Sequence, residues 1–161
     1  MVIIRKACAA DVPAIADLVN GYADEQVMLP RTPEDVALAL DDYVVAADRR
    51  GRVLACGALR EYSPSVAEVV SIAVAREAQG QGLGRAVVSR VEELARVRGY
   101  VDVFLVTVTP AFFESLGYVC VARASYPEKR CRHEVSMAEC AHCEKVCMWR
   151  PVTVAALERA A

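Results

Sequence analysis

A glycine-rich hexapeptide constrains the fold of this chain more than any other feature. It runs Gln79-Gly80-Gln81-Gly82-Leu83-Gly84 and stands between two segments of different periodicity. Residues 67–75 (AEVVSIAVA) form an apolar, β-branched run that predicts a strand, and apolar residues recur at helical spacing from 83 to 95. The first N–H groups of a helix have no partner within it, so this strand, turn and helix predict an anion site. A tight connection without a ligand is the alternative interpretation.

The spacing of the glycines argues against two common phosphate loops. A nucleoside triphosphate loop requires a lysine and then serine or threonine after its last glycine, and neither follows Gly84. A dinucleotide-binding turn requires a third glycine at the position of Arg85. The hexapeptide is therefore a loop of neither kind.

The rest of the chain predicts an α/β layer with helices packed on a mixed sheet. Further strands are expected at 2–7, 43–47, 53–61, 101–108 and 118–122, and further helices after Asp11, from Thr32 and over 110–117. The charged stretch 48–52 contains a glycine and predicts a hairpin between two antiparallel strands. The predicted order is β-α-α-β-β-β-α-β-α-β, followed by a cysteine-rich segment from about residue 125.

The helix that follows the glycine loop has one apolar and one polar face. Five apolar residues are expected to face the core: Leu83, Val87, Val91, Leu94 and Ala95. Five polar residues are expected to face solvent: Arg85, Ser89, Glu92, Glu93 and Arg96.

Length and charge limit the classes of protein to consider. A chain of 161 residues falls in the size range of one domain, so 1–161 is expected to form a single unit. A net charge of -2 gives no general attraction to nucleic acid or to an anionic membrane. No apolar run reaches the roughly 18 residues that span a bilayer, and Arg5, Lys6 and Asp11 interrupt the place where a signal peptide is apolar. We therefore expect a cytoplasmic protein whose partner is indicated by local features of the sequence and not by its overall charge.

The hexapeptide also carries a resemblance to a known family. It matches the pattern Gln or Arg, two residues, Gly, one residue, and Gly or Ala, which opens a helix after a strand in the GNAT N-acetyltransferase superfamily. The later segment 112–118 (FFESLGY) is similar to the family's F-Y-E-K-x-G-F. The resemblance implies the GNAT fold, an α/β (α+β) architecture with a mixed, mostly antiparallel central sheet and helices on both faces.

Membership of this superfamily implies acetyl-CoA as co-substrate. The diphosphate would lie on the amides of the loop, and the pantetheine arm would bind the backbone of the preceding strand where two parallel strands, 69–74 and 101–106, splay apart. The residues implied in cofactor binding are Ile72, Ala73, Val74, Gln79, Gly80, Gln81, Gly82, Leu83, Gly84 and Arg85.

Three local matches resemble the acetyltransferase domain of N-acetylglutamate synthases, particularly the short stand-alone kind. They are 28–32 (MLPRT), 67–74 (AEVVSIAV) and 104–107 (FLVT) with 112–118. The resemblance implies an amino-acid N-acetyltransferase that acts on L-glutamate in arginine biosynthesis. One departure is Val70, which stands where those enzymes carry an arginine.

Two cations and one hydroxyl are candidates for the acceptor site. Arg31 and Lys129 lie outside the regular helices and would neutralise the two carboxylates of glutamate. The resemblance also implies Thr107 on the acceptor side. For each cation, surface solvation is the alternative.

Direct attack of an amine on a thioester needs a base and an acid. Glu68, at the start of the strand beside the slot, is the candidate base, acting through a water. Phe113 stands where the superfamily usually has an acidic tyrosine, so Tyr118 or solvent would protonate the departing thiolate.

Other functions stay open at this level. The chain would also suit another small amine or a protein N-terminus as acceptor, or a non-catalytic module that senses acetyl-CoA or an amino acid. Homodimer formation is also open. Cys131, Cys140, Cys143 and Cys147 offer enough thiols for a tetrahedral zinc site, although reduced thiols that fold a tail over the core are the favoured interpretation.

Overall fold

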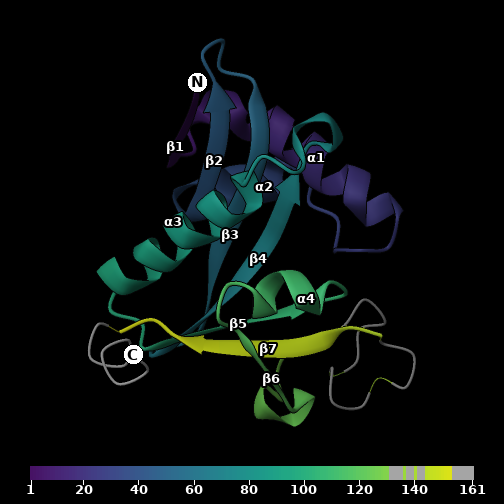
Figure 1. Cartoon of the computed structure of the whole chain (residues 1–161), viewed down its shortest axis with the longest axis vertical. Coiled ribbons are helices and arrows are strands. Elements are labelled where there is room, and N and C mark those ends of the chain that lie inside the picture. Colours follow the sequence, from purple (N-terminus) through teal and green to yellow (C-terminus); the bar gives the residue numbers. More distant parts are fainter. Residues whose placement is uncertain (131–135, 137–139, 141–143, 154–161) are drawn as a thin grey trace.

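A computed structural model describes residues 1–130, 136, 140 and 144–153 of the chain (Figure 1). Its strands are β1 (Val2–Lys6), β2 (Tyr43–Asp48), β3 (Val53–Ser63), β4 (Val66–Val74), β5 (Asp102–Thr107), β6 (Val119–Val121) and β7 (Val146–Pro151). Its α-helices are α1 (Val12–Asp24), α2 (Pro33–Leu38), α3 (Leu83–Val97) and α4 (Pro110–Glu114). Single 3-10 turns are η1 (Ala9–Asp11), η2 (Leu40–Asp42), η3 (Arg76–Ala78) and η4 (Arg123–Ser125).

The described strands form one sheet in the order β1-β2-β3-β4-β5-β7-β6. Neighbouring strands run antiparallel except for β4 and β5, which pair in parallel. The expected hairpin between β2 and β3 is present, with Gly51 at φ +81° in its turn. The prediction of a mixed, mostly antiparallel sheet is confirmed.

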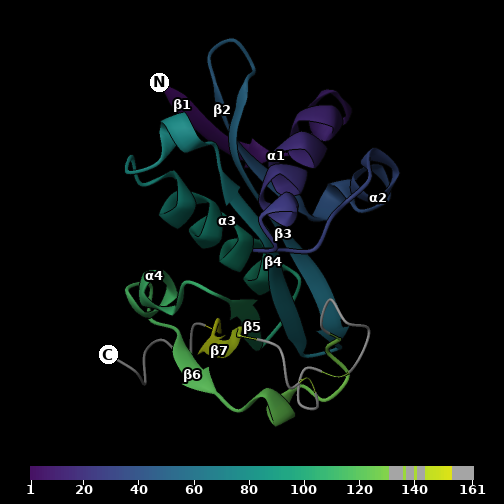
Figure 2. The same cartoon turned by 90° about the vertical axis from the view of Figure 1, so that its right-hand side faces the viewer.

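Helices cover both faces of the sheet because successive residues of a strand point to opposite faces and both sets are apolar here. Along β2, Val44 and Ala46 pack in the cluster that includes α3, whereas Tyr43 and Val45 pack in the cluster that includes α1 and α2. Figure 2 shows α1 and α2 on one side of the upright strands and α3 on the other. Burial of both faces gives the chain the two apolar layers that a sheet of this kind needs.

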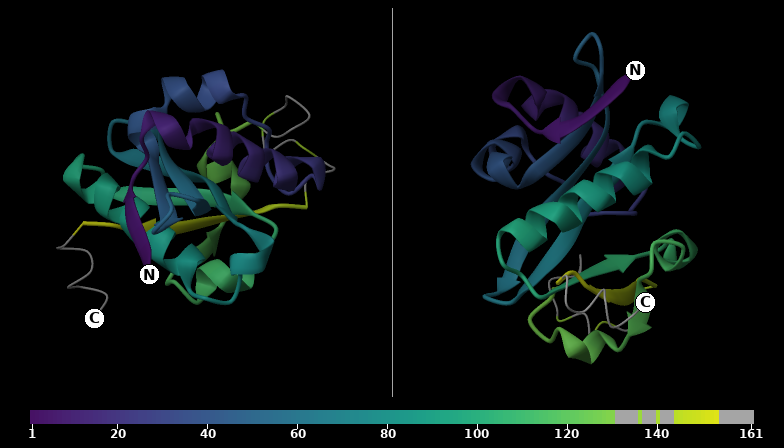
Figure 3. Two further views of the ribbon diagram at one scale, coloured as in Figure 1. Left: turned by 90° about the horizontal axis from the view of Figure 1, so that it is seen from above. Right: turned by 60° about the vertical axis from the view of Figure 1, so that its left-hand side comes forward.

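Strand β7 was not among the predicted elements. It inserts between β5 and β6 and pairs antiparallel with both, so β5 becomes an interior strand. The right-hand view of Figure 3 shows β5, β7 and β6 grouped below α3. The segment is short and ends at Pro151, and its partner strands are distant in sequence, so local pattern gives little signal for it.

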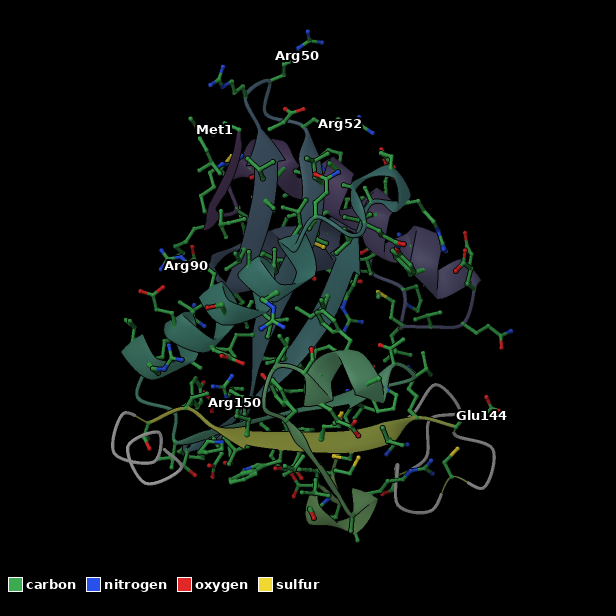
Figure 4. The ribbon with its side chains drawn as sticks, viewed as in Figure 1. Met1, Arg50, Arg52, Arg90, Glu144 and Arg150 are labelled. Atoms are coloured by element: carbon green, nitrogen blue, oxygen red, sulfur yellow. The ribbon has the colours of Figure 1, made fainter. Side chains whose placement is uncertain are left out.

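One prediction on α3 is wrong. Glu92, expected to face solvent, is 3% exposed. Its carboxylate accepts a hydrogen bond from the hydroxyl of Tyr118 and lies near the guanidinium of Arg150, which Figure 4 shows on β7. The pattern of α3 itself carries no information about partners that arrive from the C-terminal strands.

The sheet opens between β4 and β5. Their ladder pairs Val66, Ala67 and Glu68 with 102–104, and β4 then continues to Val74 paired with β3 but no longer with β5. In Figure 1, β4 rises steeply while β5 and β7 run across below it. This separation confirms the splay expected from the resemblance.

Within the described residues, no helix has the length and apolar character needed to cross a membrane.

Candidate active site

A cleft lies where β4 and β5 separate. It has a volume of about 1340 Å³ and extends from the glycine loop at the start of α3 to Lys129 and Glu144. Its walls come from the end of α1 and the segment after it, from β4 and β5, and from the first turns of α3 and α4. Sites for one small ligand measure roughly 300–1,000 Å³, so this cleft has room for a large cofactor together with a second ligand.

The N-terminus of α3 opens into one end of the cleft. Gly82 is the N-cap residue with φ +79°, and a Cβ placed on Gly80 or Gly82 would meet no atom within 4 Å. The first helical bond runs from the N–H of Ala86 to the carbonyl of Gly82, so the amides of Leu83, Gly84 and Arg85 precede it without a helical partner. Open space beside these amides and the positive end of the helix dipole suit a diphosphate.

Strand β4 carries a bulge beside the cleft. The ladder between β3 and β4 shifts register at Gly57, which stands alone opposite Ser71 and Ile72. Ser71 adopts φ +57°, in the left-handed region. A Cβ on Gly57 would collide with the side chain of Ile72 and lie 2.8 Å from Cγ1 of Val87, so any larger residue would force these side chains to move. Bulges leave backbone groups outside the ladder, and the residues from Ser71 to Val74 line the cleft.

Tyr22 ties the glycine loop to β4. Its hydroxyl donates to the carbonyl of Val74 at 2.6 Å and accepts from Nε2 of Gln79 at 2.7 Å. The guanidinium of Arg76 lies 4.9 Å from the centre of the Tyr22 ring and pairs with Glu25. These contacts fix the start of the loop against the end of α1.

A buried ion pair occupies the other end of the cleft. The ammonium of Lys129 lies 2.5 Å from Oε1 of Glu68, and Glu68 is 5% exposed. Glu68 is thus not the exposed carboxylate that a strand start often has. Burial, with a smaller contribution from Glu68, raises the pKa of the nearby Cys147 thiol to about 11. Lys129, expected to offer its charge to a ligand, uses it on Glu68 in this arrangement.

Arg31 and Thr107 also line the cleft. No ion pair joins Arg31 to a carboxylate in the part of the chain that the structure describes. The hydroxyl of Thr107 lies 3.0 Å from that of Thr109 and accepts from the N–H of Thr109 at 2.9 Å. The cleft is therefore lined by all four candidate residues, Arg31, Glu68, Thr107 and Lys129.

The sequence and the fold agree with those of known proteins. The model of the acetyltransferase (GNAT) family matches residues 14–118. The chain belongs to this family. Among curated proteins, it is 34% identical over 142 residues to the uncharacterized N-acetyltransferase CT2212 of Chlorobaculum tepidum, covering 88% of this chain and 87% of that protein. It is 31% identical over 144 residues to the amino-acid acetyltransferase of Mycobacterium tuberculosis, covering 85% and 82%.

Solved structures place this GNAT acetyltransferase in the same fold. Rv2747 of Mycobacterium tuberculosis, in complex with CoA and NLQ, has a TM-score of 0.80 at 24% identity, with 92% of this chain and 98% of that one covered. The N-acetylglutamate synthase of Neisseria gonorrhoeae, complexed with coenzyme A and N-acetyl-glutamate, has a TM-score of 0.82 at 21% identity. The match covers 94% of this chain and 35% of the gonococcal chain.

Tyr118 lies away from the cleft of this GNAT acetyltransferase. It is 2% exposed and its hydroxyl donates to Oε1 of Glu92 at 2.8 Å, beneath α3. Burial and then the Glu92 carboxylate raise the pKa of Tyr118 well above its usual value. These contacts contradict the expectation that Tyr118 protonates a departing thiolate. Phe113 has no proton to donate, and Tyr118 packs edge to face against it in the core, so neither supplies an acid to the cleft.

The four C-terminal cysteines are described only in part. Cys131 and Cys143 lie outside the described residues. Cys140 and Cys147 are both buried, at 6% and 3% exposure. In the described ranges no group of three or more His, Cys, Asp or Glu side chains is arranged to hold a metal ion. The zinc alternative stays a prediction.

Three residues beside the cleft were missed by the sequence analysis as site residues. Tyr22 was not singled out, although its hydroxyl contacts Gln79 of the glycine loop. Gly57 sits inside a strand pattern, which is a known signal for a bulge or a close approach. Asn20 gave no signal, because its partner lies in a connection with no periodicity of its own.

Proposed function

We propose that this chain transfers the acetyl group of acetyl-CoA to the α-amino group of L-glutamate, the step that opens arginine biosynthesis. One observation carries the proposal: a single cleft is lined by the start of α3 with its free amides, by Arg31 and by the Glu68–Lys129 pair. The similarity to the amino-acid acetyltransferase of Mycobacterium tuberculosis supports an amino acid as acceptor. Coenzyme A in both solved relatives supports the co-substrate.

Acetyl-CoA would bind along the splayed edge of β4. Its diphosphate would accept hydrogen bonds from the amides of 79–85, where the loop leaves open space. Its pantetheine arm would pair with the backbone of Ile72, Ala73 and Val74, as an added strand does. This placement brings the thioester to the middle of the cleft, between the two ends of β4.

The acceptor would bind at the end of the cleft that holds Arg31 and Lys129. Arg31 offers a guanidinium that can form two parallel hydrogen bonds with one carboxylate. Lys129 would contribute a second positive charge once the acceptor competes with Glu68 for it, and Thr107 would add a hydroxyl. The acceptor amine would then face the thioester.

The chemical step is a direct displacement. The neutral amine nitrogen forms a bond to the thioester carbon, the carbon–sulfur bond breaks, and the sulfur leaves as a thiolate. Glu68 would take the proton that the amine loses, directly or through one water. A backbone N–H in 72–74 would stabilise the negative charge that develops on the carbonyl oxygen. Solvent would supply the proton to the thiolate.

Release of free thiol tests the proposal. Purified protein is incubated with acetyl-CoA and, separately, with L-glutamate, L-glutamine, L-aspartate, L-arginine or a short peptide with a free N-terminus. We expect the highest kcat/KM with L-glutamate. Turnover with a different amine alone would remove the acceptor assignment and keep the transferase. Binding of acetyl-CoA without thiol release from any acceptor would favour a sensing module. L-arginine is also the first inhibitor to try, as an end product of the pathway.

A further inference from the structure

One side-chain amide holds both backbone groups of Arg31. Nδ2 of Asn20 donates to the carbonyl of Arg31 at 2.7 Å, and the N–H of Arg31 donates to Oδ1 of Asn20 at 2.8 Å. Asn20 lies on α1, half-buried, and Arg31 lies 11 positions further along the chain. The amide pairs with the backbone as a neighbouring strand would, so it fixes the peptide groups on both sides of the Arg31 Cα.

This contact closes a segment that forms one wall of the cleft. Helix α1 ends at Asp24, and Arg31 brings the chain back to α1 through its bonds with Asn20. The residues between them that line the cleft are Glu25, Gln26, Val27, Met28 and Leu29. Regular secondary structure is absent from 28–31. A connection of this kind has little to define its backbone apart from such side-chain bonds. The position of Arg31 therefore depends on Asn20.

The guanidinium of Arg31 is left with capacity for a ligand. Its Nη1 donates to the carbonyl of Pro30 at 3.1 Å. It also lies close enough to the Tyr43 hydroxyl to lower the pKa of that phenol, which burial raises. A guanidinium with free N–H groups on a cleft wall suits an acceptor carboxylate.

We propose that Asn20 is a positioning residue for the acceptor, and that it acts by holding Arg31 where its guanidinium meets the acceptor carboxylate. This inference rests on the proposed function, because it needs an acceptor that Arg31 binds. Asn20 itself touches the backbone and not the ligand. Its loss should therefore weaken acceptor binding and leave acetyl-CoA binding at the far end of the cleft unchanged.

Steady-state kinetics of three variants test the inference: Asn20→Ala, Arg31→Ala and the double variant. Arg31→Ala should raise the KM for L-glutamate about 10–100-fold, the effect of losing hydrogen bonds to a charged group. Asn20→Ala should raise it about tenfold through misplacement of that group. The KM for acetyl-CoA should change less than about twofold in both. The double variant should match Arg31→Ala, because Asn20 has no effect once its target is gone.

Thr32→Ala is the matched control. Thr32 is the N-cap of α2 and accepts from the N–H of Asp35 at 3.1 Å, so its loss lowers helix stability while both Asn20 bonds remain. The KM for L-glutamate should stay at the wild-type value. An equal rise in Thr32→Ala would show a general effect of local instability and overturn the inference.

The remaining outcomes separate the inference from the proposed function. If Arg31→Ala raises the KM for L-glutamate and Asn20→Ala does not, the inference fails and the acceptor assignment stands. A KM for L-glutamate that is higher in the double variant than in Arg31→Ala also overturns the inference, since Asn20 would then act by another route. If Arg31→Ala has no effect on the KM for L-glutamate while thiol release continues, Arg31 does not bind the acceptor, so the inference fails while transfer to L-glutamate stands. Absence of thiol release with L-glutamate in the wild type overturns the proposed acceptor before any variant is made.

Discussion

The guanidinium of Arg150 on β7 lies 3.2 Å from the buried carboxylate of Glu92 on α3, although the two residues are 58 positions apart. The same nitrogen donates to the carbonyl of Leu116 at 2.8 Å, and the Tyr118 hydroxyl donates to Glu92. Glu92 therefore joins α3 to the C-terminal part of the sheet. Because α3 begins at the glycine loop and β5 borders the cleft, this junction also supports the site.

Arg150→Ala should destabilise the protein by about 3 kcal/mol, because it leaves the Glu92 carboxylate buried with less compensation. Urea unfolding measures the change. Arg90→Ala is the control: Arg90 pairs with Glu93 on the exposed side of the same helix, at 2.6 Å, and should cost at most about 0.5 kcal/mol. Figure 4 labels both arginines. Similar losses in the two variants would contradict a special role for the buried pair.

Gly82→Glu should abolish stabilisation by acetyl-CoA. The new carboxylate would stand at the N-terminus of α3 and repel the diphosphate. In the wild type, acetyl-CoA at about a hundred times its Kd should raise Tm by about 5–10 °C. Gly51→Glu is matched in backbone strain, since Gly51 has φ +81° in the exposed β2–β3 turn, and it should keep the full shift. A shift retained in Gly82→Glu, or absent from the wild type, would remove the cofactor site.

Glu68→Gln should lower kcat about 100-fold with a smaller change in the KM for acetyl-CoA, because an amide cannot accept the proton from the acceptor amine. Measurement of initial rates with saturating L-glutamate tests this. Glu144→Gln is the control, since Glu144 is an exposed carboxylate that also lines the cleft. Equal rates for Glu68→Gln and the wild type would exclude Glu68 as the base.

Stability should fall with pH above about 9. Burial raises the pKa of Cys56 to about 12 and that of Cys147 to about 11, from 9.0. Both thiols stay protonated in the folded protein while they ionise in the unfolded chain, so their contribution is full below pH 9 and is lost as pH rises toward 11–12. Each thiol should contribute a loss of about 1.5 kcal/mol between pH 9 and 10.5.

Comparison with Cys56→Ala isolates the contribution of one thiol. Its free energy of unfolding, measured in urea at pH 8 and pH 10.5, should decline less steeply than that of the wild type. The test compares how far the free energy of unfolding falls between the two pH values in each protein. The absolute values are not compared, because the substitution also removes packed volume. Parallel declines in the two proteins would show that Cys56 ionises equally in both states.

Features of single segments could be predicted from the sequence. The glycine loop, the strand before it and the helix after it follow from glycine spacing and from side-chain period, which depend on neighbours a few residues away. The hairpin at Gly51 and the cap at Thr32 have the same local origin, and the structure confirms both. The family signature lies in these local features, so it was readable without coordinates.

Contacts between distant segments could not be predicted in the same way. Tyr118 matched the pattern of a family segment, but the ring turns into the core because Glu92 is buried there to receive its hydroxyl. Strand β7 is stabilised by two neighbours that its own six residues do not reveal. A charged side chain is expected in solvent unless a partner reaches it, and the sequence does not say which partner will.

The sequence by itself determined the family, the glycine loop and most of the elements, because each depends on local backbone preference and periodic burial. The tertiary structure decided which charges meet. It placed Lys129 on Glu68, Arg150 on Glu92 and Asn20 on the backbone of Arg31. Such pairs form only when packing removes water from both groups and leaves each as the other's nearest partner, and that depends on how whole elements are stacked.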